Sequence, residues 1–267
     1  MKKFFGFLFA VLMMASMMSP AYANFPDEDT WKLNSRGEII VYKENGITYT
    51  VPQPKPIDGI KCDGSVDAMI NVAESQAEYT GCIAMIGGKM RWLSYYANIW
   101  TVDEYNKTHD EPEPRISETS YMKWCSEFAC WCARTCGLTA DQFPSKTTSK
   151  GLAKFFSKQG RLYAFKATQK DGATNSKIAK EWFETYDSAG TMSLKDLKRG
   201  DILQLRMDGT DYLEPNHTAI VLCVENETVK VIEGNIQCDK WHSKVTDYRH
   251  YKPHEIIAVI RPAYTEW

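Results

Sequence analysis

Four short apolar runs near the end of the chain constrain the fold more than any other feature of the sequence. They are rich in Ile, Leu and Val, as strands are, and they cover residues 202–205, 218–224, 229–233 and 256–260. Earlier in the chain, residues 66–79, 121–136 and 152–159 place apolar side chains at helical spacing. Helices followed by antiparallel strands predict an α+β fold rather than an alternating α/β fold.

The N-terminus has the parts of an export signal. Lys2 and Lys3 precede an apolar stretch, and an Ala-x-Ala cleavage pattern closes at Ala23. A membrane anchor is the alternative, but the stretch is shorter than the roughly 20 apolar residues that a bilayer requires. No Cys follows the cut, which argues against a lipoprotein anchor. We therefore expect residues 1–23 to be a signal peptide. The mature chain is then secreted to the periplasm, the cell wall or the medium.

The mature chain divides into a short appendage and one large domain. Residues 38–42 and 47–51 have the composition of strands around an Asn45-Gly46 turn, which predicts a β-hairpin. Three prolines between residues 52 and 56 then predict a stiff linker. So small a hairpin has little core of its own. We expect residues 24–60 to pack on the main domain, residues 61–267, rather than to act as a separate binding module.

Charge and composition argue against nucleic-acid binding and against a calcium loop. The chain has a formal charge of −2, which becomes −4 once Lys2 and Lys3 are removed, and its charged residues of both signs are interspersed. This pattern is not that of a nucleic-acid-binding protein. The acidic residues at 110–114 are of the type that binds calcium, but their spacing matches no calcium loop, and a solvated loop is the better interpretation.

The sequence contains eight cysteines, and export makes disulfides possible. Cys62 and Cys82 are one candidate pair, although the connectivity cannot be read from the sequence. If one Cys stays reduced for catalysis, an odd number remains, which implies a further free thiol or an intermolecular bond. The cysteines between residues 125 and 136 do not form two C-x-x-C pairs and have no His nearby. We therefore expect no metal site.

Cys125 is the strongest candidate for a nucleophile. It stands at the start of a helical pattern, in the run Trp124-Cys125-Ser126. Unpaired backbone N–H groups and the positive end of the helix dipole favour a thiolate at this position. The same N–H groups can form an oxyanion hole for acyl transfer. Such a cysteine needs a base that folding brings to it.

His217 is the best candidate for that base among the five histidines. It opens the apolar run that ends at Val224, and a turn joins this run to the next, so the two predict a hairpin. In that hairpin, residues whose numbers add to about 453 face each other, which places His217 near Glu233 and Asn235. These two residues share strand parity and should point to the same face. A polar group there can hold one imidazole nitrogen and leave the other for the thiol.

Together these stretches resemble the CHAP family of cysteine amidases and peptidases. The resemblance rests on W-C-S-x-F-x-x-W-C-A-R at 124–134, G-D-I at 200–202, His217 before an apolar strand, and I-E-G-N at 232–235. It covers roughly residues 67–265, with longer spacers at about 90–118 and 166–195. Related NlpC-type hydrolases fit less well, because they usually show Asp before the nucleophile and His as the third residue.

The resemblance implies a papain-like α+β fold, with N-terminal helices packed on an antiparallel sheet. It also implies that Cys125 is the nucleophile, that His217 is the base and that Glu233 orients His217. Asn235 completes the polar set. Trp124, beside the nucleophile, is either a substrate contact or a core residue. No cofactor is required.

The function implied is that of a secreted cysteine hydrolase, an amidase or endopeptidase that cuts amide bonds of bacterial peptidoglycan through a thioester. The alternative, from another class, is a non-catalytic cell-wall-binding or interaction protein that retains the fold. A third hypothesis is a toxin-like hydrolase delivered to rival cells, which the export signal disfavours.

Overall fold

The computed structural model describes residues 33–44, 46–86, 89–100, 124–144, 148–166, 173–207 and 214–267. The predicted signal peptide and the acidic stretch at 110–114 lie outside these residues, as does part of each predicted spacer. In the described part of the chain, no helix is both long enough and apolar enough to cross a lipid bilayer.

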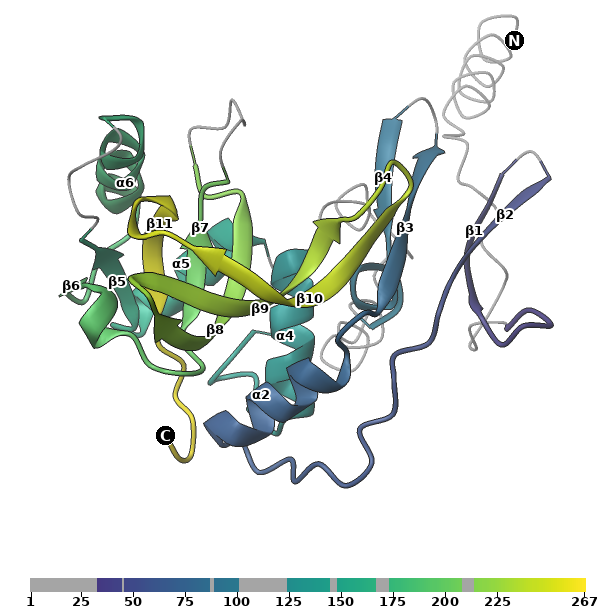
Figure 1. Cartoon of the computed structure of the whole chain (residues 1–267), viewed down its shortest axis with the longest axis horizontal. Coiled ribbons are helices and arrows are strands. Elements are labelled where there is room, and N and C mark those ends of the chain that lie inside the picture. Colours follow the sequence, from purple (N-terminus) through teal and green to yellow (C-terminus); the bar gives the residue numbers. More distant parts are fainter. Residues whose placement is uncertain are drawn as a thin grey trace, which may run out of the picture.

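A curved nine-stranded sheet organises the main domain (Figure 1). Its strand order is β4-β3-β10-β9-β8-β7-β11-β5-β6, and neighbours are antiparallel except for the edge pair β5–β6, which is parallel. The strands are β3 (Thr80–Ile86), β4 (Lys89–Leu93), β5 (Leu162–Phe165), β6 (Thr191–Met192), β7 (Ile202–Leu205), β8 (His217–Glu225), β9 (Thr228–Gln237), β10 (His242–Tyr251) and β11 (Ile256–Ile260).

The longer helices are α2 (Val66–Ser75), α4 (Cys125–Thr135), α5 (Ser149–Lys158) and α6 (Ala173–Thr185). A short π-helix spans Tyr95–Trp100, and single 3₁₀ turns occur at Leu194–Asp196 and Pro253–Glu255. Local capping explains where α2 and α5 begin, because Ser65 and Thr148 each accept a backbone N–H of the first turn through their side chains. The N-cap of α4 is Trp124, which makes no such hydrogen bond. The start of α4 therefore depends on other contacts.

The centre of the sheet is buried on both faces. Along β8 and β9, Ile220 and Ile232 pack in one apolar cluster together with residues of α2, α4 and α5. Their alternate neighbours Ala219, Val221 and Val231 lie in a second cluster, as strand alternation requires. Burial on both faces explains why these strands appear in the sequence as nearly continuous apolar runs.

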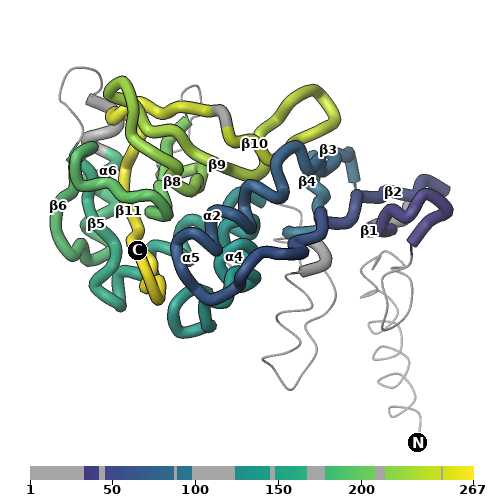
Figure 2. The backbone as a smooth tube through the Cα atoms, turned by 60° about the horizontal axis from the view of Figure 1, so that its bottom comes forward, coloured from purple at the N-terminus to yellow at the C-terminus, as the bar shows by residue number. Residues whose placement is uncertain are grey.

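The hairpin of β1 (Ile39–Glu44) and β2 (Ile47–Val51) forms a separate two-stranded sheet. Ile39, Val41 and Val51 are buried in a small apolar cluster with residues of β3 and β4. The chain then runs through residues 52–65 to α2, as the tube in Figure 2 shows. The domain boundary at residue 60 stays a prediction.

The α+β class is confirmed at the level of mixed helices and a large sheet, while the papain-like arrangement stays a prediction. All four predicted strands of the main domain are present, and α4 begins at Cys125. Five strands of the same sheet were not predicted: β3, β4, β5, β6 and β10. The pairing of β10 with β9 is irregular at two places. Strict alternation is lost there, so the sequence lacks the period of two that marks a strand.

Candidate active site

Cys125 is the first residue of α4 and lies where the helix meets β8 and β9. Only 4% of the surface of Cys125 is exposed, and its thiol forms no disulfide bond. The N–H groups of the first helical turn have no acceptor within the helix. They therefore add positive potential beside the sulfur.

His217 is the first residue of β8, where it pairs with Leu205 of β7. Its Nε2 lies 2.7 Å from Oε2 of Glu233 on β9, and both side chains are almost completely buried. Since Glu233 occupies Nε2, Nδ1 is the ring nitrogen left for the Cys125 thiol, whose pKa the charge of the imidazole lowers. The structure thus brings Cys125, His217 and Glu233 together.

The β8–β9 register explains the meeting of His217 and Glu233. Val224 pairs with Val229 and Ile220 with Ile232, with a one-residue irregularity between Val221 and Cys223. The register predicted from the sequence is therefore confirmed to within one residue.

The thiol and the imidazole shift each other's protonation. Burial raises the pKa of Cys125, but the positive charge of His217 and hydrogen bonds to the sulfur outweigh burial, and the pKa of the thiol is lowered. Burial likewise lowers the pKa of His217, yet Cys125 and Glu233 together raise it to about 9. Both shifts favour a thiolate–imidazolium pair at neutral pH.

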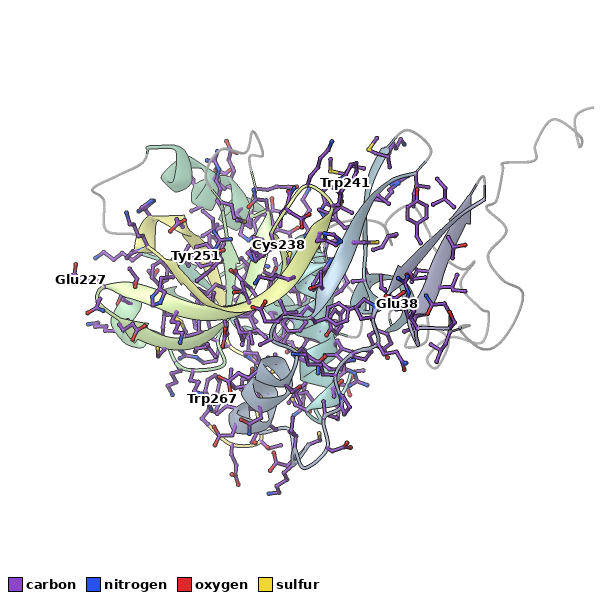
Figure 3. The ribbon with its side chains drawn as sticks, turned by 45° about the vertical axis from the view of Figure 1, so that its right-hand side comes forward. Glu38, Glu227, Cys238, Trp241, Tyr251 and Trp267 are labelled. Atoms are coloured by element: carbon purple, nitrogen blue, oxygen red, sulfur yellow. The ribbon has the colours of Figure 1, made fainter. Side chains whose placement is uncertain are left out.

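Two residues of β10 hold Glu233, and the sequence analysis missed both. The Tyr251 hydroxyl donates to Oε2 of Glu233 at 2.9 Å, and Nε of Arg249 lies 3.6 Å from its Oε1. The Arg249 guanidinium also lies 5.2 Å from the centre of the Tyr251 ring. Tyr251 sits in the packed body of the sheet, whereas Trp241 lies beyond the other end of β10 (Figure 3). The sequence analysis could have found them only by predicting β10 as a strand that pairs with β9.

Asn235 lies two residues after Glu233 in the sequence but has a different backbone conformation. Its φ is +63°, so it adopts the left-handed conformation that Asn tolerates better than most residues. A residue in this conformation interrupts the alternation of side chains along β9. The expectation that Asn235 and Glu233 point to the same face depended on that alternation. Its Oδ1 is buried without a hydrogen-bond partner in the described residues. A catalytic role for Asn235 stays a prediction.

Trp124 lies in the core, and none of its surface is exposed. Its ring packs edge-on against Tyr79 at 6.1 Å and Phe128 at 6.4 Å, and lies 5.5 Å from the Tyr96 ring. This position argues against the predicted substrate contact. A large buried aromatic beside the nucleophile instead anchors the start of α4.

All eight cysteines are free, including the candidate pair Cys62 and Cys82. Within the described residues, no group of three or more His, Cys, Asp or Glu side chains is arranged to hold a metal ion. The chemistry that the site offers follows from a thiol of lowered pKa, an imidazole of raised pKa and a carboxylate that hydrogen-bonds to the imidazole.

Comparison with known proteins agrees with this geometry. Residues 117–235, a little under half of the chain, match the family model of the CHAP domain, and this segment contains Cys125, His217 and Glu233. No curated protein and no solved structure matches the chain. CHAP domains generally belong to hydrolases that act on peptidoglycan. Residues 117–235 of this chain are therefore similar to the CHAP domain.

Proposed function

We propose that this protein is an exported cysteine hydrolase that cuts amide bonds of bacterial peptidoglycan. The observation that carries the proposal is the convergence of three distant residues, with Nε2 of His217 2.7 Å from the Glu233 carboxylate and the charge of the imidazole lowering the pKa of the Cys125 thiol. A cysteine at a helix N-terminus beside a sheet-borne histidine is also the arrangement expected of a papain-like fold. Export rests on the signal peptide expected at residues 1–23.

The proposed reaction is acyl transfer in two steps. The Cys125 thiolate attacks the amide carbonyl, and the oxyanion that forms is stabilised by backbone N–H groups at the start of α4. Protonated His217 gives its proton to the leaving amine as the C–N bond breaks, which leaves a thioester on Cys125. Neutral His217 then takes a proton from the water that attacks the thioester, and the C–S bond breaks to restore the Cys125 thiolate beside protonated His217. The product leaves as a carboxylic acid, which ionises in water. Glu233 stabilises the imidazolium in both steps.

Intact peptidoglycan provides the direct test. The protein starting at residue 24 should release new amino groups from it, and mass spectrometry of the products should identify the bond. A Cys125→Ala variant should release none, and Cys223→Ala, which removes an exposed cysteine of β8, should match the wild type. Binding without cleavage by the wild type and by Cys125→Ala alike would favour the non-catalytic cell-wall-binding protein.

A further inference from the structure

Tyr251 and His217 share one oxygen atom of Glu233. The Tyr251 hydroxyl lies 2.9 Å from Oε2 of Glu233, and Nε2 of His217 lies 2.7 Å from the same atom. The other oxygen, Oε1, has no hydrogen-bond partner in the part of the chain that the structure describes. The two hydrogen bonds to Oε2 therefore set the rotation of this carboxylate.

All three side chains are shielded from water. Tyr251 is 1% exposed, His217 2% and Glu233 0%, and the centres of the Tyr251 and His217 rings lie 6.4 Å apart. In a group so deeply buried, a lost hydrogen bond is not replaced by bulk water. Removal of the phenol oxygen would leave the Glu233 carboxylate with one hydrogen bond in place of two.

Protons fix the direction of both hydrogen bonds. Burial and the negative charge of Glu233 raise the pKa of Tyr251 well above its ordinary value, so Tyr251 stays a phenol and donates. A carboxylate has no proton to donate, so Nε2 of His217 must donate as well. In the neutral imidazole the free lone pair is then on Nδ1, the nitrogen that serves as the base in the proposed reaction.

The strand register explains why Tyr251 faces Glu233. Tyr251 pairs with Val229 of β9, and directly paired residues share a face of the sheet. Val229, Val231 and Glu233 follow one another at every second position of β9, so they share that face too. Tyr251, Val229 and Val231 are buried in the same apolar cluster, which agrees with this assignment.

An extra residue in β10 is needed for this arrangement. Thr246 pairs with Glu233 and Arg249 with Val231, so β10 advances by three residues (246 to 249) while β9 advances by two (233 to 231). In a regular strand, residues three apart point to opposite faces. The extra residue lets Arg249 and Tyr251 point to the Glu233 face together with Thr246.

Arg249 supports both Tyr251 and Glu233. Its guanidinium lies 5.2 Å from the centre of the Tyr251 ring, and its Nε lies 3.6 Å from Oε1 of Glu233. The ring is thus held by a cation–π contact as well as by burial. Both restrict the movement of the hydroxyl.

We propose that Tyr251 is a positioning residue of the active site. Its hydroxyl holds Oε2 of Glu233 where this atom accepts the Nε2–H of His217, and so keeps Nδ1 available to Cys125. The inference rests on the proposed function, in which Cys125 is the nucleophile and His217 the base. Tyr251 is too deeply buried to touch the substrate itself.

The test is the pH dependence of alkylation at Cys125 by iodoacetamide in the full-length protein. Fragment-ion mass spectrometry separates Cys125 from Cys130 and Cys132. Tyr251→Phe removes only the hydroxyl, so the imidazole loses its fixed orientation and stabilises the thiolate less well. The midpoint of the acid limb should rise by roughly half a pH unit, the shift that a typical hydrogen bond is worth.

Tyr264→Phe is the matched control. It also removes a buried phenol oxygen, whose hydroxyl donates to the Gly200 backbone oxygen at 2.8 Å, and it should keep the wild-type midpoint. Equal shifts in the two variants would overturn the proposal, as would an unchanged midpoint in Tyr251→Phe.

A double substitution tests whether Tyr251 acts through Glu233. In a Glu233→Ala background, Tyr251→Phe should cause no further shift of the midpoint, because the shared oxygen is already absent. A full additional shift would mean that Tyr251 acts on the thiol by another route, and the proposal would fall. If Glu233→Ala does not fold, the comparison of Tyr251→Phe with Tyr264→Phe decides alone.

Hydrolysis gives a separate readout. On soluble peptidoglycan fragments, Tyr251→Phe should lower kcat by roughly tenfold, because a small misplacement of a catalytic group is costly. KM should stay unchanged, since Tyr251 has no substrate contact to lose, and a raised KM at wild-type kcat would contradict a positioning role. Failure of the wild type to cleave peptidoglycan would contradict the proposed function alone, because the alkylation midpoints need no substrate.

Discussion

Glu233 is the residue on which the electrostatics of the site depend. Its side chain is fully buried, and an ionised carboxylate is costly to bury unless charged or hydrogen-bonding partners surround it. His217, Tyr251 and Arg249 are those partners. One of its oxygens serves His217 and Tyr251 together, so the phenol limits the movement of the carboxylate that orients the imidazole.

Replacing Glu233 with Gln should lower the pH at which activity is lost on the alkaline side. Glu233 helps raise the pKa of His217 to about 9, and His217 must be protonated to donate to the leaving amine. Loss of the carboxylate charge lowers that pKa. The alkaline limb of kcat/KM should then move from about pH 9 down by roughly one to two units.

The matched control is Glu225→Gln at the exposed end of β8, which should leave the alkaline limb in place. The measurement is the pH profile of peptidoglycan cleavage. An alkaline limb at the wild-type pH in Glu233→Gln would mean that Glu233 does not set the protonation of His217.

At the scale of elements, α4 differs from α2 and α5 in what determines its start. Ser65 and Thr148 cap α2 and α5 locally, while α4 has no side-chain cap. Its first turn is instead positioned by close packing on β9. Gly234 permits that approach, because a Cβ added there would lie 2.6 Å from Cζ3 of Trp124 and 2.8 Å from Cβ of Phe128.

Gly234→Ala should therefore push α4 away from β9 and destabilise the protein by roughly 1–3 kcal/mol, the usual cost of overpacking a core. Alkylation of Cys125 should also lose its low-pH reactivity, because the sulfur moves away from His217. Chemical denaturation and alkylation measure the two effects. Gly160→Ala is the comparison, since an added Cβ there meets open space. Its only cost is the backbone strain of a non-glycine residue at positive φ. Equal stability and wild-type alkylation in Gly234→Ala would show that the contact does not position α4.

At the scale of the whole molecule, the C-terminal segment ties the sheet to α2. The Thr265 N–H donates to Gly64, the Val66 N–H donates to Glu266, and the Tyr264 hydroxyl donates to Gly200. Figure 2 shows the C-terminus beside α2. Close by, Arg261 makes a two-pronged contact with fully buried Asp201, at 2.9 and 2.7 Å. The G-D-I motif at 200–202 is thus a structural junction between β7 and the segment after β11.

Arg261→Met should lower the free energy of unfolding by roughly 3 kcal/mol, because it leaves a buried carboxylate without its partner. The control is Arg199→Met, which breaks a surface pair with Asp67 and should cost less than about 1 kcal/mol. Urea titration measures both. In the folded protein, the alkylation midpoint of Cys125 should stay at its wild-type value for both variants. Equal costs for the two substitutions would contradict the assignment of Asp201 as a buried junction.

Local sequence patterns were sufficient to predict the central strands, the start of α4 and the register of one strand pair. Apolar runs marked the four central strands, helical spacing and the position of Cys125 marked the start of α4, and the turn between Val224 and Val229 set the β8–β9 register. These features depend on periodicity over a few residues, which is readable without knowledge of distant contacts. The pairing of His217 with Glu233 followed from them.

Tertiary structure alone decided the surroundings of the site. Trp124 is buried in the core, and Tyr251 and Arg249 contact Glu233 from an irregular strand. Ser149 contacts Thr218 from a helix that has no recognisable motif. A buried charge or hydroxyl is stabilised by whichever partner packing brings within hydrogen-bonding distance. That partner is set by the curvature of the sheet and the close approach of α4 at Gly234, and neither leaves a periodic trace in the sequence.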